Sequence, residues 1–469
     1  MPACSPVVSD SIGTDAVDAA PWSMADEIAS QIRLPDISTS RFDITDFGAV
    51  PDDGQDDRPA ILAAIAAASG SGGGRVILPA GHWYSAGPIV LQSHVDLHVS
   101  SGATLLFSPH AADFLPVVRT RWEGTMMMGY SPLIYAADVE DVAITGKGLI
   151  DGNADSEFLS WNSKGHNSLV GLADVLRLRQ MGDDGVPVES RVFGEGSYLR
   201  PSAIEFLGAH RVLLEDYTIR NAPFWVNHLV FTQDATVRRV NVDSHRANND
   251  GIDVDSSSHV LIENNHIRAG DDSVAVKSGR DRDGRDVAKP SEYVVVRHND
   301  TKGGDGIAIG SEMSGGVRYV FFDDNVLHGG SSAVRFKASL DRGGVVEHVR
   351  VRKLDVGEFD TLFLFQLVRG DETDGRFPST YRDIDFDDVR ADRVRRFMVV
   401  NAPPAAPLRD VTMRSVSVGG AAKTLDLENV EGLKLEKVTV GGQQIDGTLT
   451  WRTAGANQES VVAWNGKAQ

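Results

Sequence analysis

The chain has 469 residues, enough for about one to three domains, and 41% of them are hydrophobic, which excludes a disordered protein. Its 46 basic and 66 acidic residues give a formal net charge of −20, and this argues against broad nucleic-acid binding, which needs clustered Lys and Arg. The single cysteine, Cys4, excludes an intrachain disulfide, and no apolar run approaches the roughly 18 residues that cross a membrane.

The first 40 residues are expected to form a partly flexible extension, followed by one catalytic domain over residues 41–469. Residues 1–21 lack the basic and apolar regions of a signal peptide. They predict a cytoplasmic protein, or a secreted or periplasmic one whose leader has been removed. Cys4 is either the trace of a lipoprotein cleavage site or a free thiol, and we prefer the free thiol. The apolar spacing over Met24–Ile32 predicts a short surface helix.

A longer helix is predicted next, because either Asp56 or Asp57 can act as its N-cap and its apolar residues fall on one face. Gly72–Gly74 ends this helix, and Arg75–Leu78 is predicted as a strand.

An eight-residue pattern recurs from about residue 210: an alternating apolar strand, polar residues, then a second short strand. Its copies are Val212–Ile219, Val260–Ile267, Val294–Thr301, Val320–Leu327, Val349–Val356, Ile384–Ala391, Val411–Val418 and Leu433–Val440, with a weaker copy that ends at Val242. Successive copies end 22 to 35 residues apart, which indicates one structural unit with variable loops. We therefore predict an all-β solenoid with stacked parallel sheets, whose open end the N-terminal helix caps.

Carboxylates gather on two successive coils of this solenoid, in Asn248–Asp253 and in Ala269–Ser273. Asp250 and Asp271 are 21 residues apart, about one coil, so stacking would bring Asp250 beside Asp271 or Asp272. Crowded carboxylates raise at least one pKa, and a protonated acid near an ionised carboxylate suits glycoside hydrolysis. Taken singly, such residues are more often turn caps.

Two cations follow on a later coil. Arg335 and Lys337 flank Phe336 in an alternating strand, so both point to one face. Near the carboxylates they could bind an anionic sugar through charge-assisted hydrogen bonds; alone they would be a solvated strand face.

Together these motifs resemble glycoside hydrolase family 28, the polygalacturonases and their relatives. The segments that carry the resemblance are Asp46–Ala49, Trp122–Gly124, Tyr130–Tyr135, Gly148–Gly152, Phe193–Gly196, Asn221–Trp225, Asn248–Asp253, Gly270–Asp272, Ile309–Gly316 and Arg335–Lys337. The resemblance implies a right-handed parallel β-helix and an inverting hydrolase of a uronate-containing plant cell-wall polysaccharide, of the polygalacturonan or rhamnogalacturonan type.

By the same resemblance Asp271 is the general acid, and Asp250 and Asp272 activate water. Substrate binding is assigned to Asn248, Lys277, His228, Arg335 and Lys337. No metal and no cofactor are implied. The family's Gly-His-Gly segment is replaced here by Gly303–Gly306, so that its histidine maps onto Gly304 or Asp305 and polygalacturonan as the substrate is put in question.

Two alternatives stay open at this point: a calcium-dependent pectate lyase on a similar β-helix, and a non-catalytic glycan-binding β-helix. The inserted segments near 154–200 and 279–291 could block one end of the cleft, which favours exo action. We expect a polysaccharide or oligosaccharide substrate, no nucleic-acid or membrane partner, and a monomer.

Overall fold

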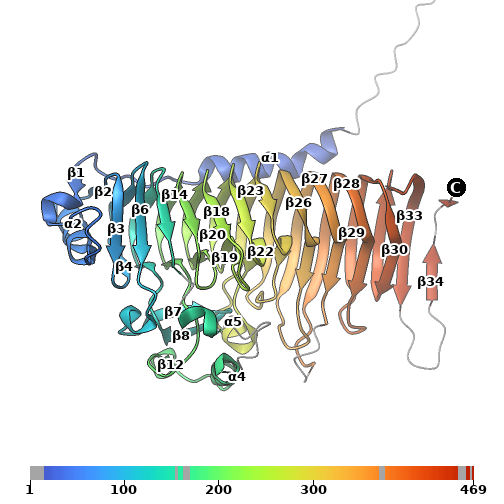
Figure 1. Ribbon diagram of the computed structural model, residues 1–469. Coiled ribbons are helices and arrows are strands. Elements are labelled where there is room, and N and C mark those ends of the chain that lie inside the picture. The colour runs from blue at the N-terminus through green and yellow to red at the C-terminus, as the bar shows by residue number, and fades with distance from the viewer. Residues whose placement is uncertain are drawn as a thin grey trace, which may run out of the picture.

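Each coil of the chain contributes one strand to each of three parallel sheets, so that the molecule is a right-handed parallel β-helix (Figure 1). The computed structural model describes residues 15–153, 157–161, 170–368, 375–452, 461–464 and 467–468; Cys4 lies outside them. The predicted fold class is confirmed.

The three faces of the β-helix are built from separate strands up to residue 309. The first face contains β1 (Arg41–Asp43), β2 (Gly74–Leu78), β5 (Val95–Val99), β10 (Glu140–Thr145), β14 (His210–Glu215), β17 (Gln233–Arg238), β20 (Ser258–Glu263) and β23 (Ser291–Arg297). The second face contains β3 (Gly81–Ser85), β6 (Ala103–Phe107), β11 (Leu149–Asp151), β15 (Thr218–Arg220), β18 (Asn241–Ser244), β21 (His266–Ala269) and β24 (Asp300–Lys302). The third face contains β4 (Ile89–Val90), β9 (Ile134–Ala137), β13 (Ile204–Leu207), β16 (Asn227–Val230), β19 (Ile252–Asp255), β22 (Asp272–Lys277) and β25 (Asp305–Ile309).

Later coils run around all three faces as continuous strands. These are β26 (Val317–Lys337), β27 (Val345–Gln366) and β28 (Thr380–Asn401), followed by β29 (Leu408–Val418), β30 (Ala421–Glu428), β31 (Val430–Glu436) and β32 (Thr439–Val440). The C-terminal end departs from the parallel pattern: β33 (Gln443–Arg452) pairs antiparallel with β31, β34 (Val461–Trp464) and β35 (Lys467–Ala468).

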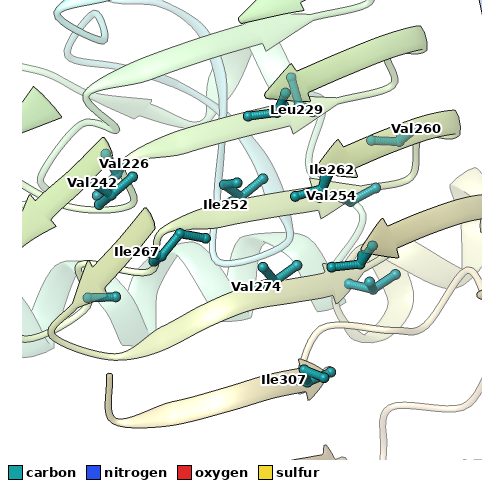
Figure 2. Close-up of a cluster of buried hydrophobic side chains, with 14 of the residues drawn as sticks. Val226, Leu229, Val242, Ile252, Val254, Val260, Ile262, Ile267, Val274 and Ile307 are labelled. Carbon is teal, nitrogen blue, oxygen red and sulfur yellow. The ribbon is translucent and has the colours of Figure 1, made fainter. Parts of the chain in front are cut away.

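The core is a stack of aliphatic layers, because inward side chains occupy the same place in each coil. Figure 2 shows this for Ile252, Val274 and Ile307, which follow one another on β19, β22 and β25. A buried asparagine ladder lies at one corner: Asn265 donates to Asn299 at 2.9 Å, and Asn299 donates to Asn325 at 2.9 Å. These side chains thereby satisfy polar groups that burial would otherwise leave without partners.

Helices cover the solenoid at three places. α2 (Arg58–Gly70) caps the N-terminal end as predicted, with Asp57 at its N-cap position; the Asp57 carboxylate, however, accepts from the backbone of Val50 and Tyr84 rather than from the helix. α1 (Asp15–Gln31) includes most of the predicted Met24–Ile32 helix, begins earlier, and packs on the first face. No described helix has both the length and the apolar character needed to cross a membrane.

The inserted elements gather at the opposite side of the solenoid from α1 (Figure 1). They are the small sheet of β7 (Val118–Trp122), β8 (Thr125–Gly129) and β12 (Val192–Phe193), with the helices α3 (Glu157–Ser160), α4 (Val170–Asp183) and α5 (Asp281–Val287). In the view of Figure 1 they lie away from β29 and β30, so that only part of the solenoid is covered.

Candidate active site

A cavity of about 270 Å³ opens where these inserted elements meet the third face. Its walls come from the β7–β8 turn, from α4, and from the loops that flank β19, β22 and β25. The lining residues are Trp122, Glu123, Leu172, Val175, Arg179, Trp225, Asn248, Asp250, Asp271, Lys277, Arg280, Ser311, Glu312, Lys337 and Arg342. Five of these are cations and four are acids.

The predicted stacking of the carboxylates follows from the backbone register of two adjacent coils. The Gly251 N–H donates to the Asp272 carbonyl at 2.9 Å, so the turn before β19 lies directly beside the turn before β22. The Asn249 side chain fixes the first turn, since its amide donates to Ala222 and Phe224 carbonyls at 3.0 and 2.9 Å. The turn therefore presents Asp250 to the cavity and Asp271 beside it.

Asp272 lies behind the cavity surface. It is fully buried, and both of its carboxylate oxygens accept hydrogen bonds from Lys337 Nζ, at 2.8 and 2.7 Å. Lys337 itself lines the cavity. Burial lowers the pKa of this lysine, but the charges of Asp272 and Asp305 outweigh burial and raise it, so Lys337 stays a cation.

Lys277 is the centre of the charge network. Its Nζ lies 3.3 Å from Glu312 Oε2 and 3.6 Å from both Asp250 and Asp253, and 4.5 Å above the Trp225 ring. Burial acts to lower its pKa, yet these carboxylates together raise it well above the usual range. A buried cation with this many anionic partners keeps several acids close together that would otherwise repel one another.

The acids around Lys277 are shifted in opposite directions. Burial, and then the neighbouring charge of Asp253, raise the pKa of Asp250 well above its ordinary value. Burial also raises the pKa of Asp253 to about 7. Glu312 differs: although burial opposes ionisation, Lys277, Arg280 and Arg342 hold its pKa well below the usual range. The surroundings therefore favour the ionised form of Glu312 and the protonated form of Asp250.

Arg335 lies next to the cavity rather than in its wall. Its guanidinium donates to Asp305 at 2.6 Å and to Gln366 at 2.6 Å. Asp305 stands opposite Asp272 in the register of β22 and β25. It belongs to Gly303–Gly306, the segment that replaces the family's Gly-His-Gly motif. Because Asp305 is an acid, the Arg335 guanidinium already has a carboxylate partner within the protein.

His228 is not brought to the cavity. Its side chain is fully buried between Glu205 and Asp255, with its ring nitrogens 3.2 and 3.5 Å from their carboxylates. Burial acts to lower its pKa, but those two carboxylates raise it to about 9. The structure gives His228 no direct access to a ligand, in contrast to its predicted place at the cleft; Asn248, Lys277 and Lys337 do line the cavity.

Several lining residues were not assigned by sequence reasoning. Trp122, Glu123, Trp225 and Glu312 stand in segments that carried the family resemblance, so a signal was present without a role attached. Arg280 and Arg342 had no such signal, because both come from loops outside the repeat. Lys277 and Arg280 bind Glu312, each with a closest distance of 3.3 Å.

One group of oxygens could in principle hold a metal ion: Asp271, Asp272 and Asp305 offer carboxylate oxygens within 4.8 Å of one another. Two of the three already have a protein cation as partner, since Lys337 binds Asp272 and Arg335 binds Asp305. A divalent ion would have to compete with these ammonium and guanidinium groups.

Comparison with known proteins agrees with this arrangement. The profile described as "Glycosyl hydrolases family 28" matches residues 195–439, the coils that carry the cavity. A second profile, "Rhamnogalacturonase A/epimerase, pectate lyase-like", matches residues 41–105. The solved structure of a hyperthermoactive exopolygalacturonase from Thermotoga maritima is 35% identical, with a TM-score of 0.85 over 91% of this chain and 99% of that one.

The chain belongs to glycosyl hydrolase family 28.

Curated relatives in family 28 are similar at lower identity. A probable polygalacturonase of Vitis vinifera is 28% identical over 81% of this chain and 74% of its own length. An exo-poly-alpha-D-galacturonosidase of Dickeya chrysanthemi is 28% identical over 64% of this chain and 52% of its own length. The family resemblance read from the motifs is thereby confirmed, and the chain is a glycosidase.

Proposed function

We propose that this family 28 enzyme removes terminal galacturonate units from polygalacturonan chains with inversion of the anomeric centre. The observation that carries the proposal is the cavity in which Asp250 and Asp271 face the same space as Lys277, Lys337 and three arginines. The two acids can act as general acid and general base in hydrolysis. The cations can form charge-assisted hydrogen bonds with a substrate that bears a carboxylate on every unit.

In the proposed reaction Asp271 gives its proton to the glycosidic oxygen as the bond to the anomeric carbon breaks. A water molecule attacks this carbon from the opposite face and loses its proton to Asp250, with Asp272 as the second carboxylate of the pair. In its ionised form Asp250 is a stronger base than an exposed aspartate because its pKa is raised, and the pairing of Asp272 with Lys337 stabilises the negative charge of Asp272.

Exo action is supported by the wall that α4 and the β7–β8 turn build. Val175 of α4 packs with Trp122 and Trp225 in one buried cluster, so this wall is anchored to the solenoid. A chain end would enter such a site, whereas the middle of a polymer would meet the wall. The exopolygalacturonase from Thermotoga maritima, which covers nearly the whole chain, agrees with this mode.

The test uses Asp271→Asn together with product analysis. The wild-type enzyme should release monomeric galacturonate from the first minutes, in the anomeric form opposite to that of the cleaved bond, as read by proton NMR. Asp271→Asn should lower kcat by roughly 10²–10⁴, the usual contribution of a general acid, with little change in thermal stability. Retained activity would remove Asp271 from the acid's role, and early long oligomers would contradict exo action.

The same assay separates this proposal from a calcium-dependent lyase. A hydrolase gives no unsaturated product. EDTA should leave its rate unchanged, because Lys337 and Arg335 already pair with two of the three acids, Asp272 and Asp305, that could hold a metal ion beside Asp271. Ultraviolet absorbance in the product, or activity lost with EDTA and restored by calcium, would favour the lyase instead.

The working location stays a prediction: secreted or periplasmic for an enzyme that meets polymer, cytoplasmic for one that completes the breakdown of imported oligomers. The monomeric state is likewise a prediction, and size-exclusion chromatography with light scattering tests it.

A further inference from the structure

A second hollow lies on the third face, immediately past the active-site cavity toward the C-terminal coils. It has a volume of about 370 Å³, within the size range of ligand sites, and we call it the distal groove. Its lining includes Arg335, Leu364, Gln366, Arg396, Val399 and Asn401.

The distal groove is continuous with the active site through one strand segment. Arg335 and Lys337 are two residues apart on β26 and point to the same face; Lys337 lines the cavity and Arg335 lines the groove. Asp305 lies between them, 2.6 Å from Arg335 and 3.9 Å from Lys337. A chain that leaves the cavity on this side therefore passes directly over Arg335.

Polar atoms in the groove lack the partners that buried groups normally have. Arg335 Nε, Arg396 Nε and Asn401 Oδ1 are all buried, and none has a hydrogen-bond partner among the described residues. Most buried polar atoms in native proteins are satisfied, so three such atoms around one hollow point to a polar ligand there. Leu364 and Val399 add apolar surface, on which the C–H face of a sugar can pack.

The charge of the groove selects an anionic ligand. Arg335 pairs with Asp305, whereas Arg395 and Arg396 share the single carboxylate of Asp360. Among the residues that line the groove, Arg335 and Arg396 are cations and none is an acid; Glu428 accepts a hydrogen bond from the lining residue Asn401 at 2.8 Å. Among the described residues, α4 and the β7–β8 turn line the cavity but not the groove, so the groove is the side on which a polyuronate chain can continue.

We propose that the distal groove binds the part of an anionic polyuronate chain that leaves after cleavage, several units beyond the scissile bond, with Arg396 as its outermost cation. This inference rests on the proposed function. Arg396 is four strands from Asp272 in the parallel register, about 19 Å at roughly 4.8 Å per strand, so only a substrate longer than a disaccharide can reach it.

The test measures kcat/KM of wild type and Arg396→Ala on di-, tri-, tetra- and pentagalacturonate. We expect digalacturonate to be cleaved equally by both within about twofold, while the pentamer loses about tenfold, the value of one charge-assisted hydrogen bond. Asn401→Ala should act in the same direction. The matched control is Arg395→Ala, which removes the same charge and shares Asp360 but does not line the groove.

The outcomes separate the two proposals. If wild type cleaves none of the galacturonates, the proposed function is wrong and the groove assignment falls with it. If wild type cleaves them but Arg396→Ala affects all lengths equally, affects none, or behaves as Arg395→Ala does, only the groove assignment is overturned.

Discussion

Among single residues, Asp253 has an environment that its sequence does not reveal. In the sequence it belongs to a polar segment, Asn248–Asp253, that resembles an ordinary turn. It is fully buried on β19, and neither carboxylate oxygen has a hydrogen-bond partner among the described residues. Lys277 Nζ lies 3.6 Å from it, and the imidazole of His228, its register neighbour on β16, is a second nearby cation. An ionised carboxylate in such a place is costly, which is why burial raises its pKa to about 7. The active site therefore contains a second buried acid, Asp253, whose ionised form is unfavourable and which shares Lys277 with Asp250.

Asp253→Asn should stabilise the protein at alkaline pH. A carboxyl whose pKa rises on folding favours the folded chain below its unfolded pKa, and that advantage is lost as pH rises from about 4 to about 7. The asparagine does not titrate, so the variant should gain up to about 3 kcal/mol in free energy of unfolding over wild type between pH 5 and pH 8. Urea unfolding at both values measures this.

Asp355→Asn on the exposed surface of β27 controls for the loss of one negative charge. An equal gain in this control, or a gain for Asp253→Asn that does not change with pH, would show that Asp253 is not a buried titrating acid.

At the scale of elements, the sequence pattern located two faces of the solenoid and missed the third. Val260–Ile267, for example, falls on β20 and β21. β21 alternates between core and solvent as the period of two requires, whereas in β20 the outward Leu261 is buried as well, because α1 packs on it. β22 is buried at every position, because inserted elements and ion pairs cover its outward side chains, including Lys277. The face that carries the chemistry is thus the one whose alternation is hidden.

The carboxylates were nevertheless placed correctly, because stacking by one coil follows from the repeat alone. The cavity wall formed by α4 and the inserted loops could not be predicted in the same way. Arg179, Arg280 and Arg342 reach the cavity from α4 and from loops that have no counterpart in neighbouring coils, so their positions depend on tertiary packing. His228 shows the reverse error: the sequence predicted it at the cleft, but in the structure it is fully buried between Glu205 and Asp255.

The packing of α1 on the first face can be tested by a single substitution. Ala25 and Ile28 of α1 are buried against Leu261, Val295 and Phe321 on the outer side of the first face. Ile28→Ala should cost roughly 2–5 kcal/mol of local packing. Trp22 of the same helix also contacts Phe321 and Arg352. Because all these contacts lie on the outer side of the first face, we expect faster amide exchange confined to α1, with catalytic rates unchanged.

Glu27→Ala, at the exposed neighbouring position, is the matched control and should leave the exchange of α1 nearly as in wild type. Global destabilisation by Ile28→Ala, seen as faster exchange in β20 and β23 as well, would show that α1 is an integral layer of the solenoid rather than a docked strap.

On the scale of the whole molecule, two electrostatic fields oppose each other. The protein carries a formal net charge of −20, and polygalacturonan is itself a polyanion, so the partners repel at long range. The cavity and the distal groove present cations that act only at short range. Catalysis on the proposed substrate therefore requires that this local attraction exceed the long-range repulsion.

This opposition predicts an unusual salt dependence. Exposed charges are screened beyond a Debye length of about 10 Å at 0.1 M salt, whereas buried pairs are screened much less. Raising NaCl from about 10 to 150 mM should therefore weaken the long-range repulsion first and lower KM for polygalacturonan, while KM for digalacturonate, with only two charges, changes less. A carboxyl-reduced polymer is the control and should show no such fall. A rise of KM for the native polymer over this range would mean that the cationic sites, and not the net charge, govern the encounter, because only then would screening remove more attraction than repulsion.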